Sequence, residues 1–95
     1  MAKKKKAVDR IDFVMMNPEI DVFKLANKLL KGIPLMVNFE EFNLIESNRV
    51  ITFLSGVVYA IDGEIEMIQD RIFLFATKKD YKDGSLRKFV NDYKE

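Results

Sequence analysis

The order of apolar patterns along the chain predicts a small two-layer α/β sandwich with the element order βαβαββ(α). Two observations carry this prediction: short apolar runs alternate with segments of helical period, and two apolar runs follow each other closely near residue 70. A strand, a helix and a strand in succession form parallel strands, whereas strands joined by a tight turn are antiparallel. We therefore expect a mixed sheet with the helices packed on one face.

The first half of the chain predicts the strand-helix-strand unit. Residues 11–16 form a short apolar run that ends at an Asn-Pro pair, which is typical of a strand. From Asp21 apolar residues recur at helical spacing until Gly32, so this segment is predicted to be a helix with one apolar face. Residues 34–39 form a second apolar run, in which the proline takes the first strand position and no hydrogen bond is lost.

The second half of the chain predicts a long helix, a hairpin and a last short helix. Asn43 is a suitable N-cap for a helix that we expect to end near Ile61, because an acidic residue follows three places later. The polar-apolar alternation of residues 64–67 and the apolar run of residues 71–77 predict two strands joined by a tight turn. Ser85 is expected to cap a final helix with one apolar stripe.

The composition is that of a single globular domain. The chain has 95 residues, of which 48% are hydrophobic and 33% are charged, values that are ordinary for a folded domain. We divide it into a basic, disordered N-terminal segment at residues 1–10 and one core domain at residues 11–95. Because no apolar run approaches the roughly 18 residues of a membrane span, a cytoplasmic location is predicted.

The residue types that carry most enzyme chemistry are missing. The sequence contains no cysteine and no histidine, which removes the commonest general base and the commonest metal ligand. Its four glycines are scattered, so no phosphate-binding loop is present. Glu64 and Glu66 share one face of a predicted strand, but two carboxylates without a third ligand are usually solvated. We therefore predict no catalytic residue, no cofactor, no metal and no enzyme activity.

Basic residues are concentrated at the N-terminus. Such a run can attract the phosphates of lipid or of nucleic acid. The alternative is a solvated terminus that only helps solubility. The block consists of Lys3, Lys4, Lys5 and Lys6.

The predicted helix that begins at residue 44 is apolar over a wide arc. Its apolar side chains cover about 200°, whereas one core contact usually requires ~100°. The surplus predicts a self-association interface of a homodimer, although deeper burial within one subunit would also account for it. The residues assigned to this interface are Val50, Phe53, Gly56, Val57 and Ala60.

One stretch of sequence resembles a known family. Residues 53–65 read FLSGVVYAIDGEI, and residues 71–75 read RIFLF. This pattern is similar to the core of SepF, the cell-division protein that couples FtsZ filaments to the membrane, and it is specific because it spans a helix, its end and a hairpin. The resemblance extends over roughly residues 11–77. It implies an α/β sandwich that dimerises and binds the C-terminal tail of FtsZ through Ser47 and Phe73.

The same resemblance implies a division adaptor that acts in the cytoplasm at the division site, with the FtsZ tail in a groove between the second helix and the last hairpin. Typical members have an amphipathic membrane-targeting helix and a linker before the core. Residues 1–10 show no apolar face, so we expect membrane contact to be weak or indirect.

The alternative function is a small nucleic-acid-binding module that uses the lysine block. An RNA-binding sheet interleaves basic and aromatic residues on its strands. The predicted strands do not show that pattern. No nucleic acid partner is therefore expected.

Overall fold

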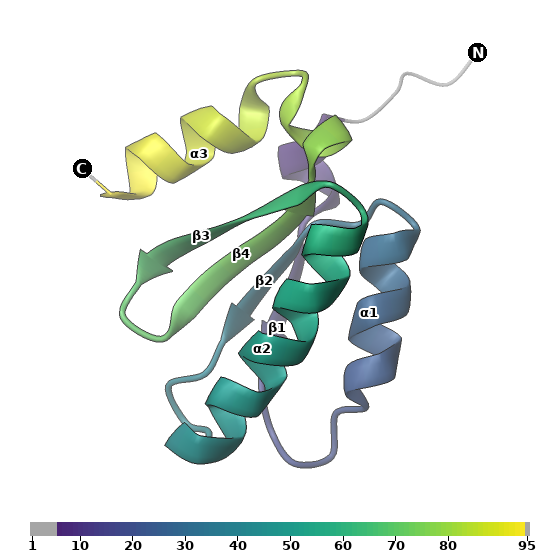
Figure 1. Ribbon diagram of the computed structural model, residues 1–95. Coiled ribbons are helices and arrows are strands. Elements are labelled where there is room, and N and C mark those ends of the chain that lie inside the picture. Colours follow the sequence, from purple (N-terminus) through teal and green to yellow (C-terminus); the bar gives the residue numbers. More distant parts are fainter. Residues whose placement is uncertain (1–5, 95) are drawn as a thin grey trace.

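Four strands form one mixed sheet in the computed structural model, which describes residues 6–94. The strands are β1 (Asp12–Met15), β2 (Leu35–Asn38), β3 (Gly63–Gln69) and β4 (Ile72–Thr77). Their order in the sheet is β1-β2-β4-β3. Strands β1 and β2 are parallel, and β4 is antiparallel to both of its neighbours. The predicted α/β class and the mixed sheet are therefore confirmed (Figure 1).

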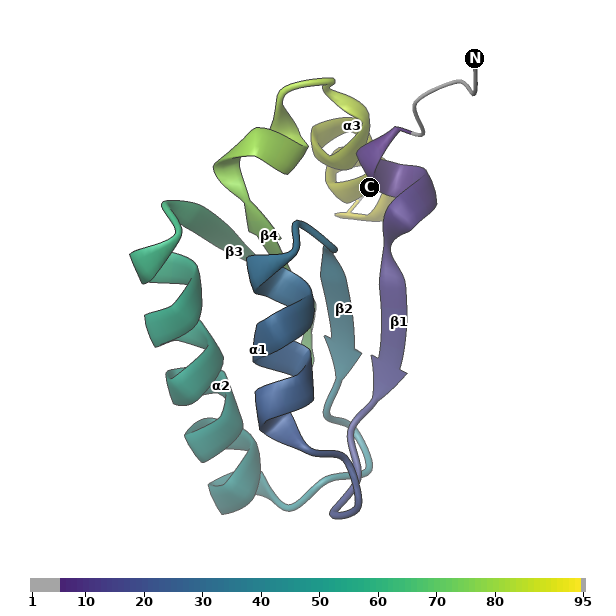
Figure 2. The same ribbon diagram turned by 90° about the vertical axis from the view of Figure 1, so that its right-hand side faces the viewer.

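The helices cover both faces of this sheet. Helices α1 (Val22–Leu30) and α2 (Leu44–Ala60) lie on one face, and α3 (Ser85–Lys94) lies on the other (Figure 2). Two 3-10 helices, η1 (Ala7–Arg10) and η2 (Lys78–Tyr81), complete the described part of the chain. The expectation that the helices pack on one face holds for α1 and α2 and is wrong for α3. The reason is that β4 is apolar on both sides and α3 covers its second side.

Local sequence signals set the helix boundaries. The Asn43 side chain accepts a hydrogen bond of 3.0 Å from the backbone N–H of Glu46, which fixes the start of α2 as predicted. Asp21 caps α1 in the same way, through a bond of 2.9 Å from the N–H of Phe23. Gly32 follows α1 with a φ of 81°, in the left-handed region that favours glycine, and this stops the helix.

The first core lies between the sheet and the helices α1 and α2. Leu35 and Val37 of β2 and Phe75 of β4 are fully buried there. The two helices also contact each other through Phe23 and Phe53, whose rings meet edge to face with centroids 5.4 Å apart. This core is continuous from β1 to α2 and contains most of the buried aromatic volume.

The second core lies between the other face of the sheet and the two ends of the chain. Its members from the sheet include Ile72, Leu74 and Ala76 of β4, and its members from α3 are Leu86 and Val90. The apolar side chains that alternate along β4 are thus divided between two cores.

The N-terminal helix η1 belongs to the second core. Ala7 is only 1% exposed, its N–H donates to Oδ2 of Asp83 over 2.8 Å, and the N–H of Val8 donates to Oγ of Ser85 over 3.0 Å. The prediction of disorder up to residue 10 is therefore wrong for residues 7–10, because partners more than 70 residues away hold them. Lys6 is exposed, and Lys3, Lys4 and Lys5 lie outside the described residues.

Candidate protein-binding site

The two residues predicted to bind FtsZ lie on neighbouring elements, Ser47 on α2 and Phe73 on β4. Ser47 is only 2% exposed, so it cannot touch a partner directly in this conformation. Phe73 is half-buried and packs beside Phe39 and Phe75, with ring centroids 6.0 and 6.3 Å away. Of the two, only Phe73 presents part of its side chain to solvent.

Arg71 joins the elements that carry these residues. Its guanidinium donates hydrogen bonds to the carbonyl oxygen of Phe42 at 2.5 Å and to the hydroxyl of Ser47 at 3.3 Å. The residue closes the β3–β4 turn with a φ of 68°, which is unusual for a side chain other than glycine. Ser47 thus helps to position Arg71 at the start of α2. Sequence reasoning missed Arg71 because these contacts span 24 residues or more.

An apolar strip runs along the α2 side of the β3–β4 hairpin, and we call it the hairpin strip. It consists of Ile65, Met67 and Phe73. In the strand register Met67 lies opposite Phe73, and Ile65 lies opposite Phe75, so the three side chains share one face. Met67 is 55% exposed, although it sits on the face that the long helix covers elsewhere. The strip therefore offers an apolar surface at the sheet edge.

The carboxylates of β3 point the opposite way. Arg87 of α3 lies 3.3 Å from Glu64 and 3.2 Å from Glu66, so both acids serve to hold α3. The alternation of residues 64–67 predicted a half-exposed strand, but a period of two does not reveal which face is covered. That is why sequence reasoning did not single out Ile65 and Met67.

The residues predicted to form a dimer interface are divided between core and surface. Val50 is buried in the first core, since it lies on the same side of α2 as Leu54 and Val58. For Val50 the expectation of an interface is wrong, and deeper burial within one subunit is the explanation. Phe53 and Val57 are half-buried against the first core.

Gly56 and Ala60 remain exposed on α2. A Cβ atom added at Gly56 would meet no atom within 4 Å. Together with the half-buried Phe53 and Val57, these residues form an outward α2 stripe, and this stripe retains the part of the predicted interface that a partner can reach.

The most perturbed ionisable groups lie around α3. The pKa of Tyr81 is raised to about 12, mainly by burial and then by the charges of Glu64 and Glu66. Hydrogen bonds from Ser85 and Ala7 lower the pKa of Asp83 to about 2. The bond to Glu64 raises the pKa of Arg87. These groups fasten α3 and η1 to the sheet.

The described residues show neither a metal centre nor a membrane-spanning helix. Residues 6–94 contain no group of three or more acidic side chains that could hold a metal ion. No helix in this part of the chain has the length and apolar character needed to cross a bilayer. Fold and surface together define a small α/β domain with an apolar strip at the edge of its sheet.

Comparison with known families identifies the family to which this domain belongs. A family model described as "Cell division protein SepF" matches residues 13–79. The chain belongs to the SepF family of cell division proteins, and the predicted resemblance is confirmed.

The curated relatives have the same description. The chain is 32% identical over 79 residues to the cell division protein SepF of Lactobacillus gasseri. The aligned region covers 81% of this chain and 55% of the relative. It is 43% identical over 67 residues to that of Limosilactobacillus reuteri, with coverage of 70% and 48%. For Caldanaerobacter subterraneus subsp. tengcongensis the identity is 37% over 70 residues, with coverage of 74% and 52%. The chain thus spans about half the length of these relatives.

Proposed function

We propose that this chain is a cell-division adaptor that forms a homodimer and binds the C-terminal tail of FtsZ, in the cytoplasm at the division site. The hairpin strip is the observation that carries the proposal. It presents exposed apolar side chains at the edge of a sheet, beside a half-buried phenylalanine. Membership of the SepF family supports the cellular role.

A peptide bound along the hairpin strip would bury Met67 and the open part of Phe73. Strand β3 is at the edge of the sheet, so the strip is accessible from the side. Arg71 stands at the end of the hairpin next to α2 and adds a positive charge for a carboxylate or a carbonyl of the peptide. In this arrangement Ser47 acts by positioning Arg71 and does not touch the peptide.

Substitutions in the hairpin strip test the peptide site. Met67→Ala removes an exposed side chain, so we expect little change in stability but a loss of about 2 kcal/mol in binding of the FtsZ tail peptide, as for a hot-spot residue. Phe73→Ala should weaken binding similarly and also lower stability, because its ring is half-buried. Leu74→Ala is the matched core control, since Leu74 faces the second core. Calorimetric titration and urea unfolding measure both quantities. Unchanged affinity in Met67→Ala and Phe73→Ala would refute the site.

The outward α2 stripe is the proposed dimer contact. Gly56→Glu places a charge on this stripe without a clash inside the subunit. Sedimentation at micromolar concentration should therefore give a dimer for the native chain and a folded monomer for Gly56→Glu, while Asn91→Glu on α3 stays dimeric. A native monomer would contradict the proposal. A dimer that survives Gly56→Glu but not Met15→Glu would move the contact to the other face of the sheet.

The lysine block at Lys3 to Lys6 is proposed to attract acidic lipid. Deletion of residues 2–6 should reduce binding to acidic vesicles at low salt and leave tail-peptide affinity unchanged. If the deletion abolished peptide binding, the block would belong to the peptide site and the hairpin strip would be misplaced.

A further inference from the structure

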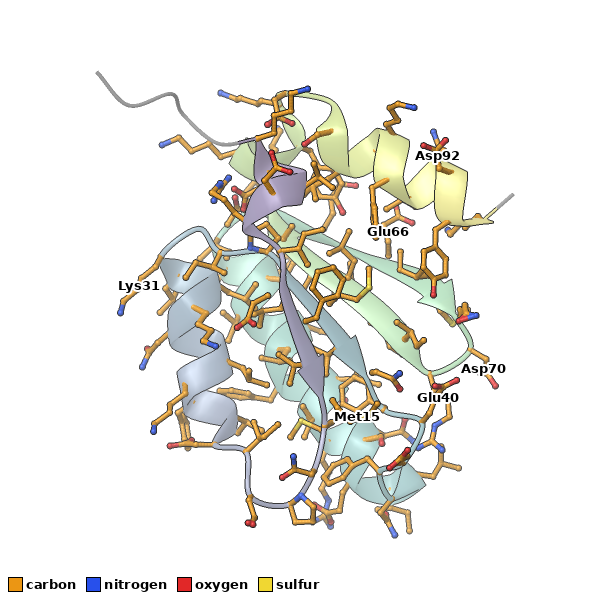
Figure 3. The ribbon with its side chains drawn as sticks, turned by 180° about the vertical axis from the view of Figure 1, so that it is seen from behind. Met15, Lys31, Glu40, Glu66, Asp70 and Asp92 are labelled. Carbon is orange, nitrogen blue, oxygen red and sulfur yellow. The ribbon has the colours of Figure 1, made fainter. Side chains whose placement is uncertain are left out.

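One end of the molecule carries two adjoining hollows, each lined by three or more lysines. Their volumes are about 660 and 540 Å³, and they share the side chains of Lys31, Lys79 and Lys82, together with Gly32 and Thr77. Lys31 follows α1, Lys79 lies in η2, and Lys82 follows η2, so three points of the chain contribute to the cluster. We call these three lysines the lysine end. Figure 3 shows Lys31 far from Asp70, which marks the hairpin turn.

The positive charge of the lysine end is not neutralised within the described residues. None of its three lysines has an ion pair among residues 6–94. The acidic groups close by are already engaged. Asp80 is buried and held by Arg10 at 2.6 Å and by the hydroxyl of Thr77 at 2.7 Å. Asp83 accepts from the neutral donors of Ala7 and Ser85, so it keeps its negative charge and offsets part of the positive charge of the smaller hollow.

One further acid lines the larger hollow. Asp62 is highly exposed and lies 3.9 Å from Lys78, a fourth lysine of this hollow. Such a pair is at the limit of an ion pair and is screened by solvent. The larger hollow therefore keeps an excess of positive charge.

Apolar side chains accompany the lysines. Leu30 and Ile61 line the larger hollow, and Leu30 is 60% exposed. Among the residues that the structure describes, no aromatic side chain lines either hollow. Proteins that bind single-stranded nucleic acid stack bases on aromatic rings, whereas lysines around an exposed leucine are typical of contact with an acidic bilayer, in which the ammonium groups meet lipid phosphates.

We infer that the lysine end is a docking surface for the phosphate headgroups of an acidic bilayer. Arg10 of η1 lines the smaller hollow as well. Docking there turns the β3–β4 turn away from the bilayer and leaves the hairpin strip accessible. The lysine end shares no residue with the hairpin strip or with the outward α2 stripe.

Vesicle binding by the full chain tests this inference. The variant Lys31→Ala/Lys79→Ala/Lys82→Ala is compared with Lys24→Ala/Arg49→Ala/Lys88→Ala, which loses the same charge from exposed sites on other surfaces. Each lysine near an acidic surface strengthens binding about fivefold, so we expect affinity for phosphatidylglycerol vesicles to fall on the order of a hundredfold in the first variant. The second variant should lose only a few-fold. Both should unfold at the native urea concentration.

Several results would overturn the inference. Equal losses in the two variants would show an effect of net charge alone, and loss only on deletion of residues 2–6 would assign the contact to the lysine block. Equal binding to phosphatidylcholine vesicles would exclude phosphate charge as the attraction. Displacement of the chain from vesicles by free pyrophosphate or by single-stranded RNA at equal phosphate concentration would indicate a soluble ligand. Tail-peptide affinity of the first variant should stay native, which separates this surface from the proposed FtsZ site.

Discussion

The two faces of the sheet are covered in different ways. On the first face α1 and α2 cover the sheet except for the β3 edge at Met67, and Leu35, Val37 and Phe75 are fully buried beneath them. On the second face α3 covers only the β4–β3 side (Figure 3). Phe13 of β1 remains 65% exposed there and Met15 is also exposed, beside a hollow of about 380 Å³.

The contacts that hold the two covers also differ. The cover of the first face is apolar. It consists of α1 and α2, each of which connects two strands along the chain. The cover of the second face comes from the two ends of the chain and combines two buried side chains of α3 with surface ion pairs to Glu64 and Glu66. Fewer buried contacts mean a lower free energy of local opening. We therefore expect α3 and η1 to open before the rest of the fold.

The largest effect is expected from Phe75→Ala. The Phe75 ring is fully buried in the first core, so its truncation leaves a cavity and should cost about 3–5 kcal/mol of unfolding free energy. The whole domain should lose stability together, as measured by urea unfolding followed by circular dichroism. A loss below that of Leu86→Ala would contradict the view that the first face dominates stability.

A smaller and more local effect is expected from Leu86→Ala. Leu86 is fully buried under α3, and a Leu→Ala change in a core costs about 2–5 kcal/mol. Since α3 can detach alone, the loss of global unfolding free energy should stay near the lower limit of this range, about 2 kcal/mol. Amide hydrogen exchange should accelerate in α3 and η1 and stay near native in α1 and α2. Uniform acceleration over all helices would show that the two faces unfold as one unit.

Much of the first face was predictable from the sequence, because its signals are local. Asn43 with its acidic partner, Gly32 after α1 and the short apolar runs set the boundaries of β1, α1, β2 and α2 to within about two residues. Each of these signals acts within one turn of the chain. For the same reason the parallel pairing of β1 with β2 followed from the order of the elements.

The second face was not predictable because its contacts are non-local. Leu86 and Val90 are spaced for an apolar helix stripe, yet the spacing does not say which surface receives it. Ala7 looks like part of a basic terminus until Asp83 binds its N–H from the other end of the chain. The link from Arg71 to Ser47 was missed for the same reason, since a positively charged turn residue is ordinarily solvated.

Arg87→Ala tests the polar part of the second cover. The Arg87 side chain is about half exposed and pairs with Glu64 and Glu66, so solvent screening limits the expected loss to under about 1 kcal/mol. Exchange in α3 should accelerate slightly, and the difference from the native chain should shrink at high salt. Lys88→Ala, which removes only an exposed pair with Asp92, is the control. A salt-independent loss would point to the packing of the guanidinium over the Tyr81 ring at 4.6 Å instead.

The smallest effect concerns the ionisation of Tyr81 beneath α3. Burial and the nearby carboxylates raise the Tyr81 pKa from 10.0 to about 12, so the folded state favours the neutral phenol. Its contribution to stability is fully present below pH 10 and is lost as the pH rises towards 12. A titration of tyrosinate absorbance should show a late step, which Tyr81→Phe removes and Tyr59→Phe retains.

Tyr81→Phe should also leave stability at neutral pH unchanged or slightly higher, because the buried hydroxyl has no hydrogen-bond partner among the described residues. The variant therefore removes the ionisable hydroxyl of Tyr81 and keeps the packing of its ring. If the late step were absent from the native chain, Tyr81 would be reached by solvent at its ordinary pKa. The cover of the second face would then admit solvent already at moderate pH. The two covers would differ in their free energy of local opening by more than their packing indicates.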